Sequence, residues 1–452
     1  MAAVEDKANY IGSLISTTRP YFIRGFLTRK VKWAVVILFS LLLIQFYGVL
    51  LSSRVSADSS TDDWSMFHHD GSRTGYTSNN GPTTTPVKVW SCQIKESENY
   101  NTSIGASPAV ADGYLYINND VGSFYCLNAS TGTPIWSNKG GQSYSSPAVD
   151  NGYVYTGYNG ITAYNASTGD KLWNYTFVSS LAHSAAVTDG VVYTSSGGHV
   201  FAFNASTGSP LWNTIPNGGT PAVAYGYVYG GSSGMIYAYN ASTGESVWNT
   251  TVGMTGVGFS SPSVADGRVY IGSALVNDNS VYCLDALTGA KIWNYTTGSW
   301  VTTSPAVFGG YVYAGSNDGN IYALNASNGN KIWSFKTGAQ PGQTGPSGGF
   351  IGSSPAVAGG IVYVGSLDGN VYALDALTGT KIWNFNAGSS IESSPAIANG
   401  YLYIASGDGT VYALGAPSTP PASLLMTIVI AVVVVVVILA VLVLIYKIRR
   451  KQ

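Results

Sequence analysis

The chain of 452 residues carries 21 basic and 22 acidic side chains, only 10% of the sequence, which excludes a charge-rich disordered protein. Its 55 glycines and 32 tyrosines favour many short β-strands joined by tight turns over a helical bundle. Six basic and two acidic residues precede residue 33 and four basic residues follow residue 446, so the middle holds 11 basic and 20 acidic residues. This acidic middle argues against a nucleic-acid partner, whose phosphates need a basic surface.

The first distinct segment is an uncharged apolar stretch at residues 33–51. It is close to the ~20 residues that a helix needs to cross a bilayer. Four basic residues between positions 24 and 32 precede it, so the positive-inside rule predicts that residues 1–32 are cytoplasmic. A signal peptide is the alternative, because Val55, Ser56 and Ala57 form a small-residue cleavage site.

A second uncharged segment, residues 423–446, is followed by a basic tail at 447–452 and predicts another transmembrane helix. Both termini are then cytoplasmic and the region between the two segments is extracellular, at the cell membrane. Glycosylation sequons agree with an exported body. They stand at Asn101, Asn128, Asn165, Asn174, Asn204, Asn240, Asn249, Asn294 and Asn325.

Between residues 107 and 415 the chain repeats a unit of about 40 residues, the spacing of four-stranded propeller blades. Each copy begins with a Ser-Pro-Ala-like strand, and its hairpin turns contain dipeptides such as Asp112-Gly113. The fourth strand carries a Trp that we expect to pack one blade against the next. These residues are Trp90, Trp136, Trp173, Trp212, Trp248, Trp293, Trp333 and Trp383.

The count of strands predicts how the ring closes. Trp90 precedes the first copy, and the last copy has three strands and no Trp. We therefore expect residues 86–92 to complete the last blade of an all-β, eight-bladed β-propeller flanked by two transmembrane helices. The predicted boundaries are 1–32 (cytoplasmic), 33–51 (transmembrane or signal), 52–85 (linker and lead-in), 86–415 (propeller), 416–422 (linker), 423–446 (transmembrane) and 447–452 (cytoplasmic tail).

Two motifs carry a family resemblance. The pattern ALDALTGTKIW at 373–383 resembles the repeat of the quinoprotein (PQQ) propellers, and WSMFHHDGSRTGY at 64–76 resembles the lead-in before such propellers. The resemblance implies an eight-bladed propeller. It covers quinone-dependent dehydrogenases and also non-enzymatic propellers, such as the scaffold lipoprotein of the outer-membrane barrel assembly machinery.

The residues favour the non-enzymatic branch. Dehydrogenases of the family use adjacent cysteines and a calcium site, whereas Cys92, Cys126 and Cys283 are not adjacent and the last two belong to blades on opposite sides of the ring. His68 and His69 precede an aspartate, but neighbouring side chains on an extended segment point to opposite sides, which argues against a metal site. We predict no catalytic, cofactor or metal residues; PQQ and calcium belong only to the dehydrogenase alternative.

The blade topology places the first and third turns, and both ends of the propeller, on one side of the disc, here called the first-turn face. The second turns and interblade loops form the second-turn face, which points away from the membrane. We predict a binding or scaffolding module for a protein or glycan partner on that distal face; a stalk without a specific ligand is a further alternative. Its candidate contacts are the unrepeated Trp300, Tyr100, Tyr144, Phe177, Phe350 and the loop 337–353.

Overall fold

The computed structural model describes residues 63–97, 100–101, 103–139, 145–157, 159–177, 183–215, 219–232, 234–252, 260–273, 278–338 and 352–416, with the single residues 440, 447 and 450. Within these residues no helix is long and apolar enough to cross a membrane. The two predicted membrane segments, 33–51 and 423–446, lie outside the described residues apart from residue 440.

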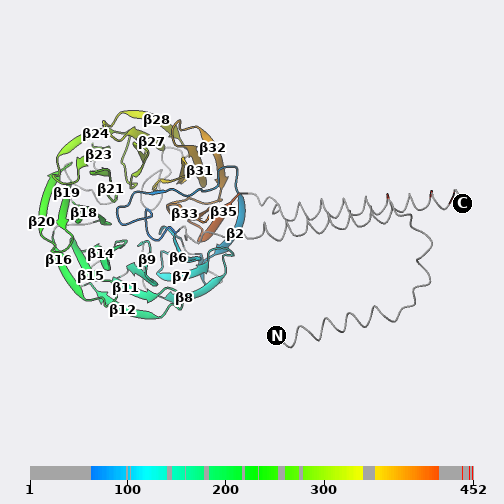
Figure 1. The fold of residues 1–452 in the computed structure, drawn as a ribbon, viewed down its shortest axis with the longest axis horizontal. Helices are drawn as coiled ribbons and strands as arrows, with labels where there is room; N and C mark the ends of the chain where they lie inside the picture. Colours follow the sequence, from blue (N-terminus) through cyan, green and yellow to red (C-terminus); the bar gives the residue numbers. More distant parts are fainter. Residues whose placement is uncertain are drawn as a thin grey trace, which may run out of the picture. The chain divides into compact units, whose positions relative to one another are not determined.

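Eight four-stranded antiparallel sheets stand around a common axis, which confirms the predicted propeller (Figure 1). Each sheet runs from a first strand near the axis to a fourth strand at the circumference. Blade 1 contains β5 (Ala109–Ala111), β6 (Tyr114–Asn118), β7 (Ser123–Asn128) and β8 (Pro134–Lys139); blade 2, β9 (Ala148–Asp150), β10 (Tyr153–Gly157), β11 (Gly160–Asn165) and β12 (Lys171–Thr176); blade 3, β13 (Ala186–Thr188), β14 (Val191–Ser196), β15 (His199–Asn204) and β16 (Pro210–Thr214); blade 4, β17 (Ala222–Ala224), β18 (Tyr227–Ser232), β19 (Met235–Asn240) and β20 (Ser246–Thr251).

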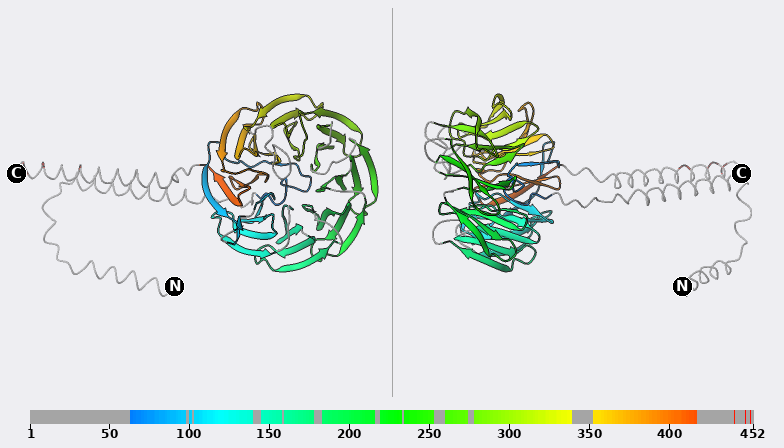
Figure 2. Two further views of the ribbon diagram at one scale, coloured as in Figure 1. Left: turned by 180° about the vertical axis from the view of Figure 1, so that it is seen from behind. Right: turned by 60° about the vertical axis from the view of Figure 1, so that its left-hand side comes forward.

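The second half of the ring repeats this order, and Figure 2 shows the disc from behind and obliquely. Blade 5 contains β21 (Ser263–Ala265), β22 (Arg268–Gly272), β23 (Ser280–Asp285) and β24 (Lys291–Thr296); blade 6, β25 (Ala306–Phe308), β26 (Tyr311–Gly315), β27 (Asn320–Asn325) and β28 (Lys331–Lys336); blade 7, β29 (Ala356–Ala358), β30 (Ile361–Gly365), β31 (Asn370–Asp375) and β32 (Lys381–Asn386); blade 8, β33 (Ala396–Ala398), β34 (Tyr401–Ala405), β35 (Thr410–Gly415) and β2 (Val87–Gln93). Three short strands lie outside this pattern: β1 (Tyr76–Thr77), β3 (Lys95–Ser97) and β4 (Tyr100–Asn101).

The ring closes as the sequence predicts. Strand β2 pairs antiparallel with β35, Val87 opposite Gly415, and so supplies the fourth strand of blade 8. The observed strand begins one residue later than the predicted segment 86–92. Because strands from the two ends of the propeller share one sheet, the ring has no open edge between its first and last blades.

The hydrophobic core lies between the blades, and the fourth-strand Trp residues join them. Each Trp Nε1–H donates to a main-chain carbonyl of the following blade. The acceptors are Ala129 (from Trp90, 2.8 Å), Ala166 (Trp136, 3.1 Å), Ala205 (Trp173, 2.9 Å), Ala241 (Trp212, 3.0 Å), Ala286 (Trp248, 3.0 Å), Ala326 (Trp293, 2.9 Å), Ala376 (Trp333, 2.9 Å) and Pro82 (Trp383, 2.9 Å). At seven interfaces a second-strand Tyr hydroxyl donates to the same carbonyl, as Tyr116 does to Ala166 at 3.0 Å.

The glycine of each third turn fits under the indole ring. Gly132 has φ +72°, and a Cβ built on it would lie 2.5 Å from the Trp90 ring. Both the positive φ and this close approach require glycine. The Thr-Gly of the repeat is therefore part of the interblade contact as well as of the turn.

A second belt of hydrogen bonds joins the blades closer to the axis. The serines that open the repeats donate and accept in turn: the Ser107 N–H donates to Ser146 Oγ at 3.0 Å, and the Ser394 N–H donates to Ser107 Oγ at 2.9 Å. The same contact links Ser146 to Ser184, Ser261 to Ser304, Ser304 to Ser354 and Ser354 to Ser394. The hydroxyl of each Ser-Pro-Ala start thus satisfies a buried N–H of the preceding blade.

Replacement of Trp248 by Phe tests the interblade contact. The variant loses the Nε1–H bond to Ala286 and part of a ring that is 8% exposed, which we expect to destabilise the propeller by about 2 kcal/mol. The neighbouring Val247, 43% exposed on the same strand, is the control, and Val247→Ala should change stability by less than about 0.5 kcal/mol. Urea unfolding of the full chain, followed by Trp fluorescence, measures both; equal effects would contradict the assigned role.

Candidate functional site

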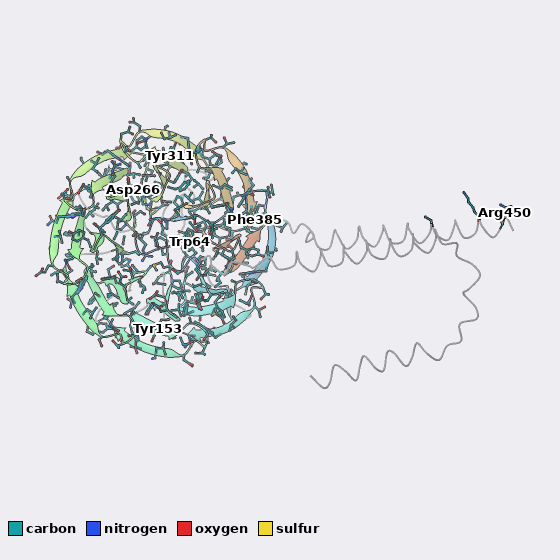
Figure 3. All side chains as sticks on the ribbon, viewed as in Figure 1. Trp64, Tyr153, Asp266, Tyr311, Phe385 and Arg450 are labelled. Carbon is teal, nitrogen blue, oxygen red and sulfur yellow. The ribbon has the colours of Figure 1, made fainter. Side chains whose placement is uncertain are left out.

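The centre of the ring is filled by the chain's own lead-in, residues 64–77, which crosses the middle of Figure 1 in blue. Its main chain bonds to the first strands of six blades, and Figure 3 labels Trp64 near the axis. The contacts are Trp64 with Val110 (2.8 Å in both directions), Ser65 O with Val149 N (2.7 Å), Gly71 O with Val223 N (2.7 Å), Ser72 O with Val264 N (2.9 Å), Thr74 O with Val307 N (2.9 Å) and Gly75 O with Val357 N (2.7 Å). Strand β1 then extends blade 7 by pairing parallel with β29.

Arg73 joins the lead-in to blades 3 and 4. Its side chain is fully buried. The guanidinium donates to Phe67 O, to Ala185 O at 2.7 Å and to Pro221 O at 3.1 Å, with a longer contact of 3.4 Å to Ser184 O. Burial lowers the pKa of Arg73 to about 9, so the group is still charged at neutral pH. A buried cation satisfied by carbonyl oxygens thus ties the lead-in to the starts of these two blades.

The lead-in forms tight turns at His68 and His69, whereas the sequence predicts an extended segment there. His68, His69 and Arg73 have φ values of +57°, +76° and +60°, because Asp70 N–H bonds back to His68 O at 3.0 Å and Arg73 N–H to Asp70 O at 3.1 Å. Tight turns let so short a segment reach several blades. Among the described residues no group of three or more His, Cys, Asp or Glu side chains gathers in a metal-binding arrangement.

Asp70 stabilises these turns. It accepts Thr74 N–H at 3.0 Å and Thr74 Oγ1–H at 2.6 Å, and its carboxylate lies 3.6 Å from the His69 ring. Burial would raise the pKa of Asp70, but the nearby His69 ring and the two bonds from Thr74 outweigh this effect and hold the pKa below its ordinary value. The carboxylate is therefore a turn cap.

One pocket among the described residues, of about 420 Å³, opens beside the lead-in. Asp63, one of its residues, accepts the N–H of Asp112 in the first turn of blade 1, so the pocket belongs to the first-turn face. The other lining residues are His69, Asp70, Thr74, Tyr76, Thr77, Ser78 and Asn79. Most of these groups are lead-in residues already engaged in turns.

Eight of the nine predicted glycosylation sites occupy two kinds of position; the ninth, Asn101, lies on β4, and its side chain is outside the described residues. Asn128, Asn165, Asn204, Asn240 and Asn325 stand at third turns, where each side-chain oxygen accepts main-chain N–H groups, as Asn128 Oδ1 does from Ser130 and Thr131 at 3.0 Å. Asn174, Asn249 and Asn294 are exposed on fourth strands. The third-turn asparagines thus have a structural role whether or not they carry a glycan, because Asp285 and Asp375 make the same turn.

The three cysteines lie in three different blades, and Cys126 and Cys283 are on opposite sides of the ring. Cys126 on β7 and Cys283 on β23 are fully buried, in blades 1 and 5, and all three cysteines are free thiols. Burial raises the pKa of the Cys126 and Cys283 thiols to about 12, so neither is a thiolate at neutral pH. Their place is that of the repeat's small core residue.

The unrepeated aromatic residues differ in exposure. Trp300 is 37% exposed, whereas Phe177 is 8% exposed and belongs to the core. Tyr144 and Phe350 lie outside the described residues, as do the Tyr100 side chain and most of the loop 337–353. Trp300 is thus the candidate contact that the structure describes as open to solvent.

Arg73 was not predicted from the sequence. The lead-in occurs once, so no repeat shows where it lies, and Arg73 is a single residue in a polar stretch. One feature of the sequence could have pointed to Arg73: it belongs to the lead-in motif that precedes the repeats, and a segment outside the repeats can fill the centre of the ring.

We expect His68 to make stability depend on pH. Its Nδ1–H donates to Arg73 O at 3.2 Å, Nε2 has no partner among the residues that the structure describes, and burial lowers the pKa of the ring to about 4. An unfolded histidine titrates near 6.5, so the folded state loses about 3 kcal/mol as the pH falls from about 6.5 to about 4. His68→Asn, which keeps a donor near Nδ1, should remove this loss.

The measurement is the urea midpoint of the full chain between pH 7.5 and 4. His69→Asn is the control, and it should retain the acid-dependent loss because His68 is intact. A pH profile of the His68 variant that matches wild type would contradict the assignment.

The geometry agrees with known solved structures. BamB from Moraxella catarrhalis superposes with a TM-score of 0.59 at 20% identity, covering 74% of this chain and 99% of that one. A quinohemoprotein alcohol dehydrogenase from Comamonas testosteroni gives 0.64 at 15% identity (81% and 82%), and the computationally designed Ika8 protein gives 0.59 at 19% (71% and 98%). At such identities the likeness concerns the fold alone.

No curated protein matches the chain in sequence. The family model described as outer membrane protein assembly factor BamB matches residues 81–215 and 214–416, which together make up most of the propeller. On the repeat, the closed ring of eight blades and this match, the chain belongs to the BamB family of PQQ-like β-propellers.

Proposed function

We propose that the chain is a membrane-anchored extracellular propeller that binds or scaffolds a protein or glycan partner through its second-turn face. The observation that carries this proposal is the filled axis: residues 64–77 occupy the centre of the ring, which leaves the loops as the surfaces that vary from blade to blade. The apolar segments 33–51 and 423–446, their basic flanks and the nine sequons support the location.

Main-chain hydrogen bonds hold Trp300 and the next residue in place. Its carbonyl accepts Asn317 N–H at 2.7 Å, and Val301 N–H donates to Ser273 O at 3.0 Å. Val301 is fully buried while the Trp300 side chain is 37% exposed. The loop therefore presents the indole on a rigid base between blades 5 and 6, and rigidity lowers the entropy lost on binding.

Two buried polar atoms beside this loop support a ligand contact. Among the described residues Ser273 Oγ and Asn317 Nδ2 have no hydrogen-bond partner, although their side chains are 1% and 2% exposed. An unpartnered buried donor is costly, and a ligand hydroxyl or carbonyl could satisfy it. The corresponding position of blade 7 is the apolar Leu367, so the turn itself does not need an amide.

The dehydrogenase alternative does not fit the residues present. Its family set starts from adjacent cysteines, but Cys126 and Cys283 are buried in separate blades. Arg73, bonded to carbonyl oxygens of blades 3 and 4, takes up axial space. We therefore propose a module without PQQ and derive no redox step.

Addition of PQQ and calcium to the purified full chain tests this choice. We expect no stoichiometric change in the absorbance of PQQ and no dye reduction with alcohols, because the described residues offer no cofactor set. Saturable binding at one equivalent with turnover would overturn the proposal in favour of the dehydrogenase.

The binding face is tested with Trp300→Ala and Asn317→Leu in cells that express the full chain. A central aromatic contact is worth about 2 kcal/mol, so crosslinking to the partner should fall about thirtyfold with Trp300→Ala. Asn317→Leu, which copies blade 7, should weaken binding without loss of the fold. Mass spectrometry of the crosslinked complexes measures both effects.

Tyr225→Asn is the matched control on the opposite face. Tyr225 is 53% exposed in the first turn of blade 4, where blades 2 and 8 carry Asn151 and Asn399. Its partners should be recovered at wild-type yield. Unchanged partners in the Trp300 variant, or equal losses in the Tyr225 variant, would count against binding through the second-turn face.

A further inference from the structure

The first-turn face is electrically uneven. On blades 1–4 its turns carry five acidic residues and one lysine, Lys171. The acids are Asp112, Asp150, Asp170, Asp189 and Glu245. On blades 6–8 the same turns carry one acid, Asp375, and three exposed lysines, Lys331, Lys381 and Lys88. Blade 5 lies between the two halves and holds two acids and two bases, so the face has an acidic half and a basic sector.

The three lysines of the basic sector share one structural position. Each stands at the start of a fourth strand, next to the third-turn end of its blade. Lys331 opens β28 opposite Leu324, Lys381 opens β32 opposite Leu374, and Lys88 on β2 lies opposite Leu414. All three therefore stand beside the third-turn end of the blade, where their side chains are exposed, and Lys381 Nζ donates to Asn384 Oδ1 at 3.3 Å on the same strand.

Exposed aliphatic side chains accompany these lysines. Ile332 follows Lys331 and Ile382 follows Lys381, with exposed fractions of 45% and 40%, and Val87 and Val89 flank Lys88 at 43% and 41%. Lysines with aliphatic neighbours suit a membrane interface, where charged headgroups cover an apolar layer: the ammonium groups stay among the headgroups and the aliphatic groups contact the layer beneath.

The fourth strands of the acidic half carry exposed aliphatic residues as well, such as Leu172 (46%) and Leu211 (52%), but the third turns differ between the two halves. Blade 7 carries Leu377, which is 60% exposed, at the position where blades 1–4 carry the serine of a sequon. Those serines are Ser130, Ser167, Ser206 and Ser242. Asn325 is the single sequon of blades 6–8, so sites for bulky hydrophilic glycans are concentrated on the acidic half.

The C-terminal end of the propeller leaves from the basic sector, whereas the N-terminal lead-in enters at Asp63, beside the first turn of blade 1. Val87 and Gly415 are paired in blade 8. Only residues 416–422 separate Gly415 from the apolar segment that starts at 423, and seven residues span at most about 25 Å. A membrane that takes up the segment 423–446 must therefore lie within that reach of blade 8.

We propose that the first-turn face of blades 6–8 rests on the anionic headgroups of the membrane that anchors the chain. This inference depends on the proposed anchoring and adds the orientation: Lys88, Lys331 and Lys381 contact headgroup phosphates, and Leu377 enters the interface. The acidic half is tilted away from the like-charged lipid, where third-turn glycans have room. Each lysine at such a surface strengthens the contact by roughly fivefold.

Lysine footprinting of the full chain in lipid nanodiscs tests the orientation. In discs with 30% anionic lipid, acetylation of Lys331 and Lys381 should slow at least threefold relative to neutral discs, and 0.5 M salt should restore it because exposed charges are screened. Lys171 is the matched control: it opens the fourth strand of blade 2, directly across the ring from blade 6. Its rate should not change.

Variants separate this inference from the anchoring. Lys331→Gln with Lys381→Gln should abolish the difference between anionic and neutral discs at Lys88, whereas Lys171→Gln should leave it intact. A chain that does not incorporate into nanodiscs overturns the anchoring and the orientation together. A chain that incorporates but shows equal acetylation at Lys171 and Lys331 in both lipids overturns the orientation alone, as does a glycan on Asn325.

Discussion

The contact of each fourth-strand Trp with the next blade sets the geometry of the whole ring. At seven interfaces its indole N–H and a second-strand tyrosine hydroxyl meet at one carbonyl, as Trp136 and Tyr116 do at Ala166, and its ring covers a turn glycine so closely that no Cβ would fit, as at Gly169. Because the contact is the same from blade to blade, it fixes a constant angle between neighbours. Eight equal angles return the chain to its starting point.

Closure forces the N-terminal region into two roles. Blade 8 has no third turn, because its fourth strand β2 comes from the other end of the chain. Trp383 of blade 7 therefore has no turn alanine to meet, and Pro82 O accepts its indole N–H at 2.9 Å instead. With residue 82 held at blade 7, the preceding residues enter the axis, where Arg73 and the turns around His68 hold blades 3 to 7 to one segment.

The repeated part of this arrangement could be predicted from the sequence, because eight copies carry the same turn residues and the same Trp at the same spacing. Trp positions alone gave the blade count and the closing strand. The lead-in could not be placed in the same way, because a single-copy segment has no period. The extended conformation assumed for His68 and His69 was wrong: carbonyls at Asp70 and His68 capture nearby N–H groups, and local turns replace a strand.

Function in such a ring has to be sought where the blades differ. The turn that carries Asn317 in blade 6 carries Leu367 in blade 7, although the Asp-Gly-Asn that follows is the same in both. The third turn that is Asn-Ala-Ser in blades 1–4 is Asp-Ala-Leu in blades 5 and 7, with the hydrogen bonds of the turn retained. In both turns either residue supports the same backbone conformation. The fold therefore does not explain why one blade has one residue and another blade the other. These two positions can therefore change without loss of the fold, and variants at them probe the two faces of the ring separately.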